Sequence, residues 1–178
     1  MSKQTKTSFA AYAAWNVEIE ELTLNKQSEH GWQLRKGGCY HTVYEADDTV
    51  RYIHKIDYNP DVSQASEEKE RYIELFEQQG WEYVNSTFNG WHYFRKLYDE
   101  TLPIGEYEIY TDSDSYSKMM KRWIRLGRML QILQLIPAVM NVWIGITLDS
   151  GSNLFMGALL AAMIIWLQNG IHKMKEKI

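Results

Sequence analysis

The sequence contains one cysteine, Cys39, so the chain cannot form an internal disulfide bond. We interpret Cys39 as a small packing residue on a strand. The five histidines show no His-x-x-x-His spacing, and a Cys-x-x-Cys pair is absent too. The sequence also lacks a phosphate-binding P-loop, a Gly-x-Gly-x-x-Gly dinucleotide motif and a Gly-x-Ser-x-Gly nucleophile elbow. We therefore expect a non-enzymatic protein with no catalytic residue, no cofactor and no metal.

Basic residues are scarce in the first two thirds of the chain, and acidic residues are scarce in the last third. Residues 1–117 contain 11 Lys/Arg and 21 Asp/Glu, a net charge of −10, whereas residues 118–178 contain 8 and 2, a net charge of +6. The acidic part argues against nucleic acid as a partner, because phosphate contacts need clustered cations. The basic part indicates contact with an anionic surface.

Two runs without a charged residue, 129–148 and 154–171, dominate the basic part. A helix of twenty residues is about 30 Å long, the thickness of the hydrocarbon core of a bilayer. The alternative is a helical hairpin buried in a soluble core, but so small a chain offers too little other surface to bury it. We therefore predict two transmembrane helices joined by an external turn, 149–153.

Cations flank this hairpin on both sides, in a basic amphipathic helix at 114–128 and in the tail 172–178, whereas the turn has none. The positive-inside rule then predicts a multi-pass protein of the cell membrane with both termini in the cytoplasm. We expect one face of the amphipathic helix to bind headgroups of an anionic inner leaflet, with topology signalling alone as the alternative. The cations of that face are Lys118, Lys121, Arg122, Arg125 and Arg128.

Polar and small residues recur every three or four positions along the first span and so form one stripe. The stripe consists of Gln131, Gln134, Ala138, Asn141 and Gly145, and the second span offers the small residues Gly157 and Ala161. Such residues let membrane helices approach closely and form hydrogen bonds between them. Two uses remain open: the spans pack on each other, or the stripe contacts a membrane helix of a protein partner or of a second copy. Pro137 predicts a kink.

Residues 17–113 form the predicted cytosolic domain, with two copies of one unit at 17–58 and 66–110. Each unit begins with an acidic helix that ends at Gly-Trp, at Gly31-Trp32 and Gly80-Trp81, an offset of 49 that also pairs Tyr44 with Tyr93. We interpret the acidic residues of both helices, among them Glu18, Glu20 and Glu21, as solvated faces. Strand patterns follow at 33–36, 39–45, 50–58, 82–88, 91–97 and 105–110, with a hairpin signal at Asn89-Gly90.

This pattern predicts an α+β domain, a single antiparallel sheet with two helices on one face. Residues 1–16 contain too short an apolar run for a signal peptide, and we interpret them as a segment that leads into the first helix. The strands are rich in aromatic residues, which either form cross-strand pairs in the core or an open face for a partner or a small apolar ligand. The candidates for that face are Tyr44, Tyr52, Trp91 and Tyr93.

Several segments together resemble the domain-of-unknown-function family 2812, over about residues 9–128. They are Glu29–Leu34, Tyr52–Tyr58, Tyr72–Val84, Gly90–Lys96 and Ile109–Asp112. The resemblance implies a bacterial, membrane-associated protein, of a kind often encoded beside PadR-type transcriptional regulators, with a role in regulation or envelope stress. It carries over no functional residues. We accordingly expect a membrane-anchored regulatory or adaptor protein that binds a protein partner, with a sensor of small apolar ligands as the alternative.

Overall fold

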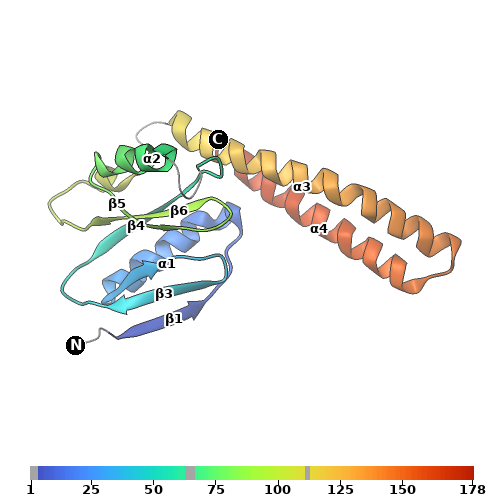
Figure 1. Ribbon diagram of the computed structural model, residues 1–178, viewed down its shortest axis with the longest axis horizontal. Coiled ribbons are helices and arrows are strands. Elements are labelled where there is room, and N and C mark those ends of the chain that lie inside the picture. The colour runs from blue at the N-terminus through green and yellow to red at the C-terminus, as the bar shows by residue number, and fades with distance from the viewer. Residues whose placement is uncertain (1–3, 63–66, 111–112) are drawn as a thin grey trace. The chain divides into compact units, whose positions relative to one another are not determined.

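The computed structural model describes residues 4–62, 67–110 and 113–178, and the chain divides into two compact units, Met1–Ser115 and Tyr116–Ile178 (Figure 1). The first unit contains six strands, two α-helices and two short 3-10 helices among its described residues. They are β1 (Thr5–Phe9), η1 (Ala14–Asn16), α1 (Val17–Glu29), β2 (Trp32–Lys36), β3 (His41–Ala46), β4 (Tyr52–Tyr58), α2 (Glu67–Glu77), β5 (Glu82–Ser86), β6 (Trp91–Leu97) and η2 (Ile104–Tyr107).

The strands form two antiparallel sheets of three strands, in the orders β1-β3-β2 and β4-β6-β5. The predicted α+β class is confirmed, although the strands form two sheets and not the single sheet that we expected. Strands β2 and β5 run beside each other without a backbone ladder, and this gap separates the sheets. In Figure 1, α1 lies between the two sheets, and α2 covers the other face of β4-β6-β5.

The internal repeat is a βαββ unit, first as β1-α1-β2-β3 and then as β4-α2-β5-β6. Both units carry a register shift at the same place, between Leu34 and Lys36 in β2 and between Tyr83 and Asn85 in β5. Each helix is followed by a glycine with positive φ, +76° at Gly31 and +82° at Gly80, which suits a residue without a Cβ. The repeat boundaries therefore differ from the sequence prediction, because each unit begins with a strand.

Three further predictions of strands need correction. Strand β1 lies in the segment 1–16, for which we predicted no strand, and the strand predicted at 50–58 opens the second unit instead of closing the first. The segment 105–110 forms no strand among its described residues, because the Tyr107 hydroxyl accepts from the Asp99 N–H (2.7 Å) and donates to its carbonyl (3.0 Å), which folds the chain back.

The last strands of the two repeats, β3 and β6, correspond with an offset of 50 residues, whereas the earlier elements correspond with an offset of 49. Leu34 pairs with Tyr44 in the first unit, and its counterpart Tyr83 pairs with Phe94 in the second. Tyr44 therefore corresponds to Phe94, not to Tyr93 as the sequence suggested, because the β5–β6 connection is one residue longer. Both side chains are buried on the face that the helix of the same unit covers; Phe94 packs there with Phe76 and Trp81.

The second unit is an antiparallel pair of long helices, α3 (Ser113–Thr147) and α4 (Gly151–Lys175), both long and apolar enough to cross a membrane. The amphipathic segment and the first span form one continuous helix through Pro137. The Asn141 side-chain amide donates to the Pro137 carbonyl (2.8 Å), within the same helix. Close packing of the two helices is visible at both ends, between Gly145 and Leu154 and between Gly127 and Ile171.

Candidate functional site

A polar cleft of about 330 Å³ lies between the edge strands β2 and β5, one from each sheet. Residues 33–35 of β2 and 82–84 of β5 occupy equivalent positions in the two repeats, so the cleft marks the place where the repeats meet. Side chains of β3, β4 and β6 complete its wall. The polar and charged side chains of the lining come from Gln33, Arg35, Glu45, Asp47, Tyr52, Glu82 and Arg95.

Arg95 is the most strongly held charged residue of this cleft. Its guanidinium makes a bidentate ion pair with Glu82, with Nε to Oε2 at 2.9 Å and Nη2 to Oε1 at 2.5 Å. Nη1 donates to the Leu34 carbonyl on the opposite strand (3.3 Å), and the guanidinium carbon lies 4.4 Å from the centroid of the Tyr52 ring. Burial opposes the charged form, but the pair with Glu82 prevails and raises the pKa of Arg95.

Two amide side chains, the buried Gln33 and the half-buried Asn85, fix the two strands that line the cleft. Asn85 joins the strands at one end, because its amide accepts from the Gly37 N–H (2.8 Å) and donates to the Gly37 carbonyl (2.9 Å). Gln33 donates to the carbonyls of Asp47 (2.8 Å) and Val50 (2.7 Å), which orders the loop before β4. The cleft is therefore open between strands that are held in place on both sides.

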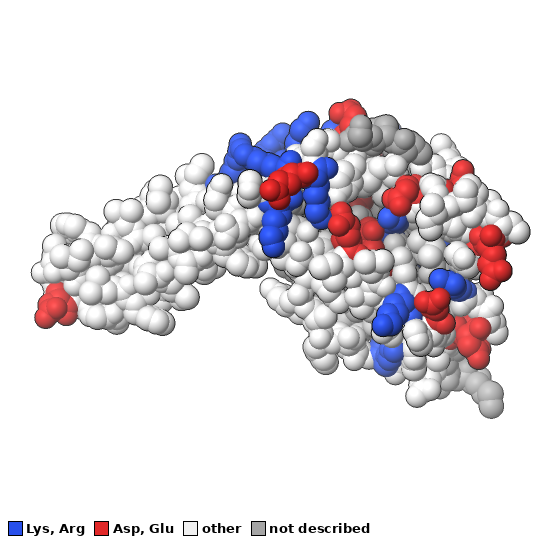
Figure 2. All heavy atoms as spheres, turned by 180° about the vertical axis from the view of Figure 1, so that it is seen from behind, with Lys and Arg blue, Asp and Glu red and all other residues white. Residues whose placement is uncertain are grey.

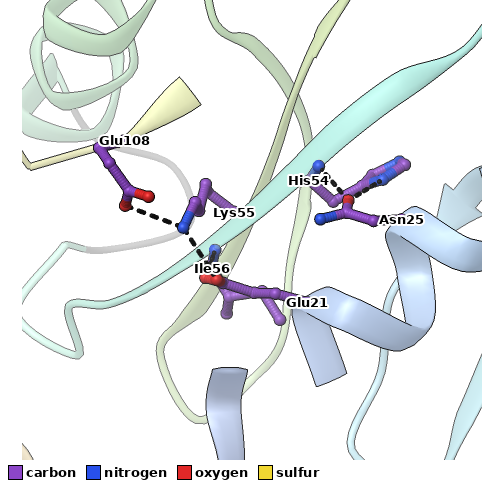
Figure 3. Close-up of polar contacts among 6 residues, drawn as sticks. All are labelled: Glu21, Asn25, His54, Lys55, Ile56 and Glu108. Atoms are coloured by element: carbon purple, nitrogen blue, oxygen red, sulfur yellow. Dashed lines mark hydrogen bonds and ion pairs between the residues drawn. The ribbon is translucent and has the colours of Figure 1, made fainter. Parts of the chain in front are cut away.

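Helix α1 covers the free edge of β4 with three side-chain acceptors, of which Figure 3 draws Glu21 and Asn25. Backbone N–H groups of alternate residues in β4 donate to side chains spaced four and three residues apart on α1. These side chains accept the hydrogen bonds that the backbone of a neighbouring strand would otherwise accept. The three pairs are Ile56 N–H to Glu21 Oε1 (2.9 Å), His54 N–H to Asn25 Oδ1 (2.6 Å) and Tyr52 N–H to Ser28 Oγ (2.7 Å).

Glu21 and Glu20 correct the prediction that the acidic residues of this helix are solvated. The Lys55 ammonium lies between the carboxylates of Glu21 (3.3 Å) and Glu108 (2.9 Å), and Glu20 accepts from the Tyr93 hydroxyl (2.8 Å). Burial raises the pKa of Glu21 to about 7, although Lys55 and the Ile56 N–H act in the opposite direction. Burial acts to lower the pKa of Lys55, but the two carboxylates outweigh it and raise the pKa.

Two buried histidines, His54 and His92, lie on β4 and β6. The Nδ1 atom of His54 contacts Asn25 Oδ1 (3.2 Å), and burial, with Arg95 nearby, lowers the pKa of His54 to about 3. His92 contacts the Asn59 carbonyl through Nε2 (3.1 Å), and burial lowers its pKa as well. We assign both a packing role, because each ring is enclosed by neighbouring side chains.

The four aromatic candidates do not share one open face. Tyr44 and Tyr93 are each only 3% exposed, on different sheets. Tyr52 lines the polar cleft under Arg95, whereas Trp91 and Tyr93 border a separate small cavity of about 70 Å³. Tyr93 also packs directly against Gly37, where an added Cβ would lie 2.4 Å from the ring. The aromatic residues thus serve mainly as core and wall.

The predicted stripe of α3 faces α4. The Gln131 side chain donates to the Ile164 carbonyl (3.1 Å) and to Gln168 Oε1 (3.2 Å). An added Cβ on Gly157 would lie 2.6 Å from Val142, so this glycine permits the close approach of the helices. Ala138 is buried beside them, and Ala161 borders an apolar groove together with Gly157. These contacts match the first of the two uses that the sequence left open, packing of the spans on each other.

The cations before the first span gather at one end of the hairpin (Figure 2). Lys118, Lys121, Arg125 and Arg128 are exposed, Arg122 is half-buried, and the opposite face of the helix, with Met120 and Trp123, is buried. The antiparallel pairing of α3 and α4 brings Lys173 and Lys175 to the same end. One end of the hairpin is therefore cationic, as a helix that meets an anionic surface requires.

The sequence did not single out the cleft. A two-residue turn at Asn89-Gly90 would set Glu82 opposite Leu97, whereas the observed register, with its shift between Tyr83 and Asn85, sets Glu82 opposite Arg95. The side chains of Gln33, Arg35 and Glu45 line the cleft from the other sheet, and no local sequence pattern predicts that the two sheets meet there. Within residues 4–62, 67–110 and 113–178, no three His, Cys, Asp or Glu side chains gather as a metal site requires.

Comparison with known proteins gives one match. The family model described as "Protein of unknown function (DUF2812)" matches residues 16–133, which include both sheets except β1 and continue into α3. No curated protein and no solved structure matches the chain significantly.

Proposed function

Because the chain belongs to the DUF2812 family of proteins of unknown function, its role has to be argued from its own structure, and we propose a membrane-anchored, non-enzymatic regulatory or adaptor protein. Its α+β unit binds an extended segment of a protein partner in the cleft between β2 and β5, and the α3–α4 hairpin holds the unit at the membrane. The observation that carries the proposal is the pair of edge strands that face each other across this cleft.

The shape and lining of the cleft support an extended polypeptide as the occupant. Edge strands offer unpaired backbone groups, and peptides add to such edges as an extra strand. A volume of about 330 Å³ lies at the lower end of the range of roughly 300–1,000 Å³ typical of ligand pockets. Charged residues of both signs, such as Arg35 and Glu45, favour a polar segment over the small apolar ligand of the alternative hypothesis.

The membrane part of the proposal rests on the hairpin. Two long apolar helices cross the bilayer, and the cationic end lies at an anionic inner leaflet, so both termini and the α+β unit are cytoplasmic. Within the polar stripe, Gln131 serves to join α3 to α4, because both of its side-chain hydrogen bonds go to α4. Partner binding is accordingly assigned to the cleft, not to the stripe.

Photo-crosslinking in native membranes tests this proposal. A photoreactive amino acid replaces Val84 in the cleft of the full-length protein, and the matched control carries it at Glu68 on the exposed face of α2. We expect a discrete protein adduct from position 84 alone, reduced at least tenfold by Arg95→Met and unchanged by the exposed-arginine control Arg71→Met. Equal adducts from both positions, no adduct at 84, or insensitivity to Arg95→Met would each contradict the proposal.

A further inference from the structure

The two surfaces equivalent to those that meet between the repeats are exposed on the α+β unit. Within the chain, α1 of the first repeat caps the edge strand β4 of the second repeat through Glu21, Asn25 and Ser28. The equivalent edge of the first repeat is β1, and the equivalent helix of the second repeat is α2. We therefore asked what β1 and α2 present at the same positions.

Strand β1 presents free backbone donors at the positions that α1 caps in β4. The Gln4 carbonyl accepts from the Ala46 N–H (2.8 Å), so in this antiparallel ladder residues 4, 6 and 8 bond to β3, and Thr5 and Thr7 direct their N–H groups outward. Thr5 and Thr7 correspond to His54 and Ile56, whose N–H groups donate to α1. Both threonines are exposed.

Helix α2 presents acceptors at the positions that cap β4 from α1. With the offset of 49 residues between the repeats, the positions of Glu21, Asn25 and Ser28 in α1 correspond to Glu70, Glu74 and Glu77 in α2. All three glutamates are exposed, and carboxylates accept hydrogen bonds from backbone N–H groups more strongly than the amide and hydroxyl that α1 uses. Lys55, the cation that pairs with Glu21, corresponds to Lys6 of β1, whose ammonium donates to Gln27 of its own chain (2.6 Å).

The outer face of the first sheet repeats this relationship. Tyr58 and Trp91, whose ring centroids lie 4.8 Å apart, pair across β4 and β6 on the face of the second sheet that looks toward the first repeat. Their counterparts on β1 and β3 are Phe9 and His41, which also pair, at 6.5 Å. Phe9 is 83% exposed, whereas Tyr58 is 2% exposed. The aromatic surface that is buried between the repeats on the second sheet is thus exposed on the first sheet.

We propose that a second copy of this chain covers this surface, with α2 of one copy along β1 of the next. Glu70 and Glu74 of one copy accept from the N–H groups of Thr7 and Thr5 of the other, as Glu21 and Asn25 do within the chain. The contact is head to tail, so it closes into a ring or extends as a row along the membrane. It goes beyond the proposed function and uses surfaces outside the β2–β5 cleft.

The test measures self-association of the full-length protein in mild detergent by sedimentation, with one variant for each side of the contact. Thr7→Pro removes an outward N–H and leaves the ladder to β3 intact, whereas Glu70→Lys with Glu74→Lys and Glu77→Lys reverses the acceptors on α2. The controls are Thr7→Ser, which keeps the N–H, and Glu67→Lys with Glu68→Lys, which reverses exposed charges at other positions of α2. Circular dichroism establishes that each variant is folded.

We expect concentration-dependent association of the wild type, weakened at least tenfold by either variant and by neither control. A mixture of the two defective variants restores one intact contact, so it forms one-to-one pairs and nothing larger. A wild type that stays a single chain at all concentrations would overturn the proposal. So would association that both variants leave unchanged, which would assign the contact to the membrane hairpin, or a mixture that forms no pairs.

Discussion

The side-chain oxygen of Asn25 accepts from His54 twice, once from the backbone N–H at 2.6 Å and once from ring atom Nδ1 at 3.2 Å. One side chain of α1 thus fixes both the edge of β4 and the tautomer of a buried imidazole (Figure 3). This relationship ties the first repeat to the second and leads to the first prediction.

Replacement of Asn25 by alanine should destabilise the protein by about 1–3 kcal/mol, because two buried donors lose their acceptor. The measurement is denaturant unfolding of the full-length protein in mild detergent, followed by tryptophan fluorescence. Lys26→Ala, at the neighbouring exposed position of the same helix, is the control and should change the free energy of unfolding by less than about 0.5 kcal/mol. Equal effects of the two substitutions would show that the edge contact contributes nothing.

His54 should make the fold sensitive to acid. Its pKa is about 3 in the folded protein against 6.5 in the unfolded chain, so between these values only the unfolded chain binds the proton. Stability therefore falls as the pH decreases from 6.5 towards 3, by about 5 kcal/mol in total from this group. His54→Gln should remove that part of the pH dependence. A difference between variant and wild type that stays constant over this range would contradict the prediction.

Glu21 should have the opposite effect in a neighbouring pH range. Burial raises its pKa from 4.5 to about 7, so between these values the folded protein holds a proton that the unfolded chain has lost. This group stabilises the fold fully below pH 4.5, and the contribution decreases as the pH rises towards 7, by up to about 3 kcal/mol.

Glu21→Gln keeps an oxygen acceptor for the Ile56 N–H and should remove this dependence, as unfolding at several pH values would show. Glu68→Gln, on the exposed face of α2, is the control. The slopes from Glu21 and His54 have opposite signs between pH 4.5 and 6.5 and partly cancel in the wild type, so each must be read from the difference between its variant and the wild type. An unchanged slope in Glu21→Gln would contradict the assignment.

Gly37→Ala should destabilise the α+β unit by about 1–3 kcal/mol, because the new Cβ would lie 2.4 Å from the Tyr93 ring and must displace it. Gly105→Ala is a matched control, since an added Cβ there has no neighbour within 4 Å among the described residues. Thermal unfolding compares the two. A Gly37→Ala variant as stable as Gly105→Ala would mean that the ring and the β2–β3 turn are not packed as described.

The sequence was informative where the signal is local. The Gly-Trp pairs marked the ends of α1 and α2, Asn89-Gly90 marked the β5–β6 hairpin, and two uncharged runs marked the long helices. Strand β1 had no such signal, because Thr5–Phe9 is polar and exposed and is a strand only through its pairing with β3. The strand predicted at 105–110 failed because Tyr107 bonds back to Asp99, a contact that no strand pattern encodes.

The cleft and the α1–β4 contact depend on how the repeats meet, and periodicity does not encode that. Glu21 belongs to an acidic run typical of a solvated face, yet it is held by Lys55 and Ile56, more than thirty residues away in the sequence. The register shift between Tyr83 and Asn85 sets Glu82 opposite Arg95, and the Leu34 carbonyl that Arg95 also binds belongs to the other sheet. Such contacts between repeats become visible only when the two sheets are placed together.

Cysteine accessibility on intact cells tests the central claim, that the hairpin holds the α+β unit at the cytoplasmic face of a membrane. In a Cys39→Ser background, single cysteines replace Ser152, at the exposed start of α4, and Glu68, on the exposed face of α2. A membrane-impermeant maleimide should label position 152 on intact cells and position 68 only after permeabilisation. Labelling of position 68 on intact cells, or release of the protein from membranes by a carbonate wash, would contradict the account.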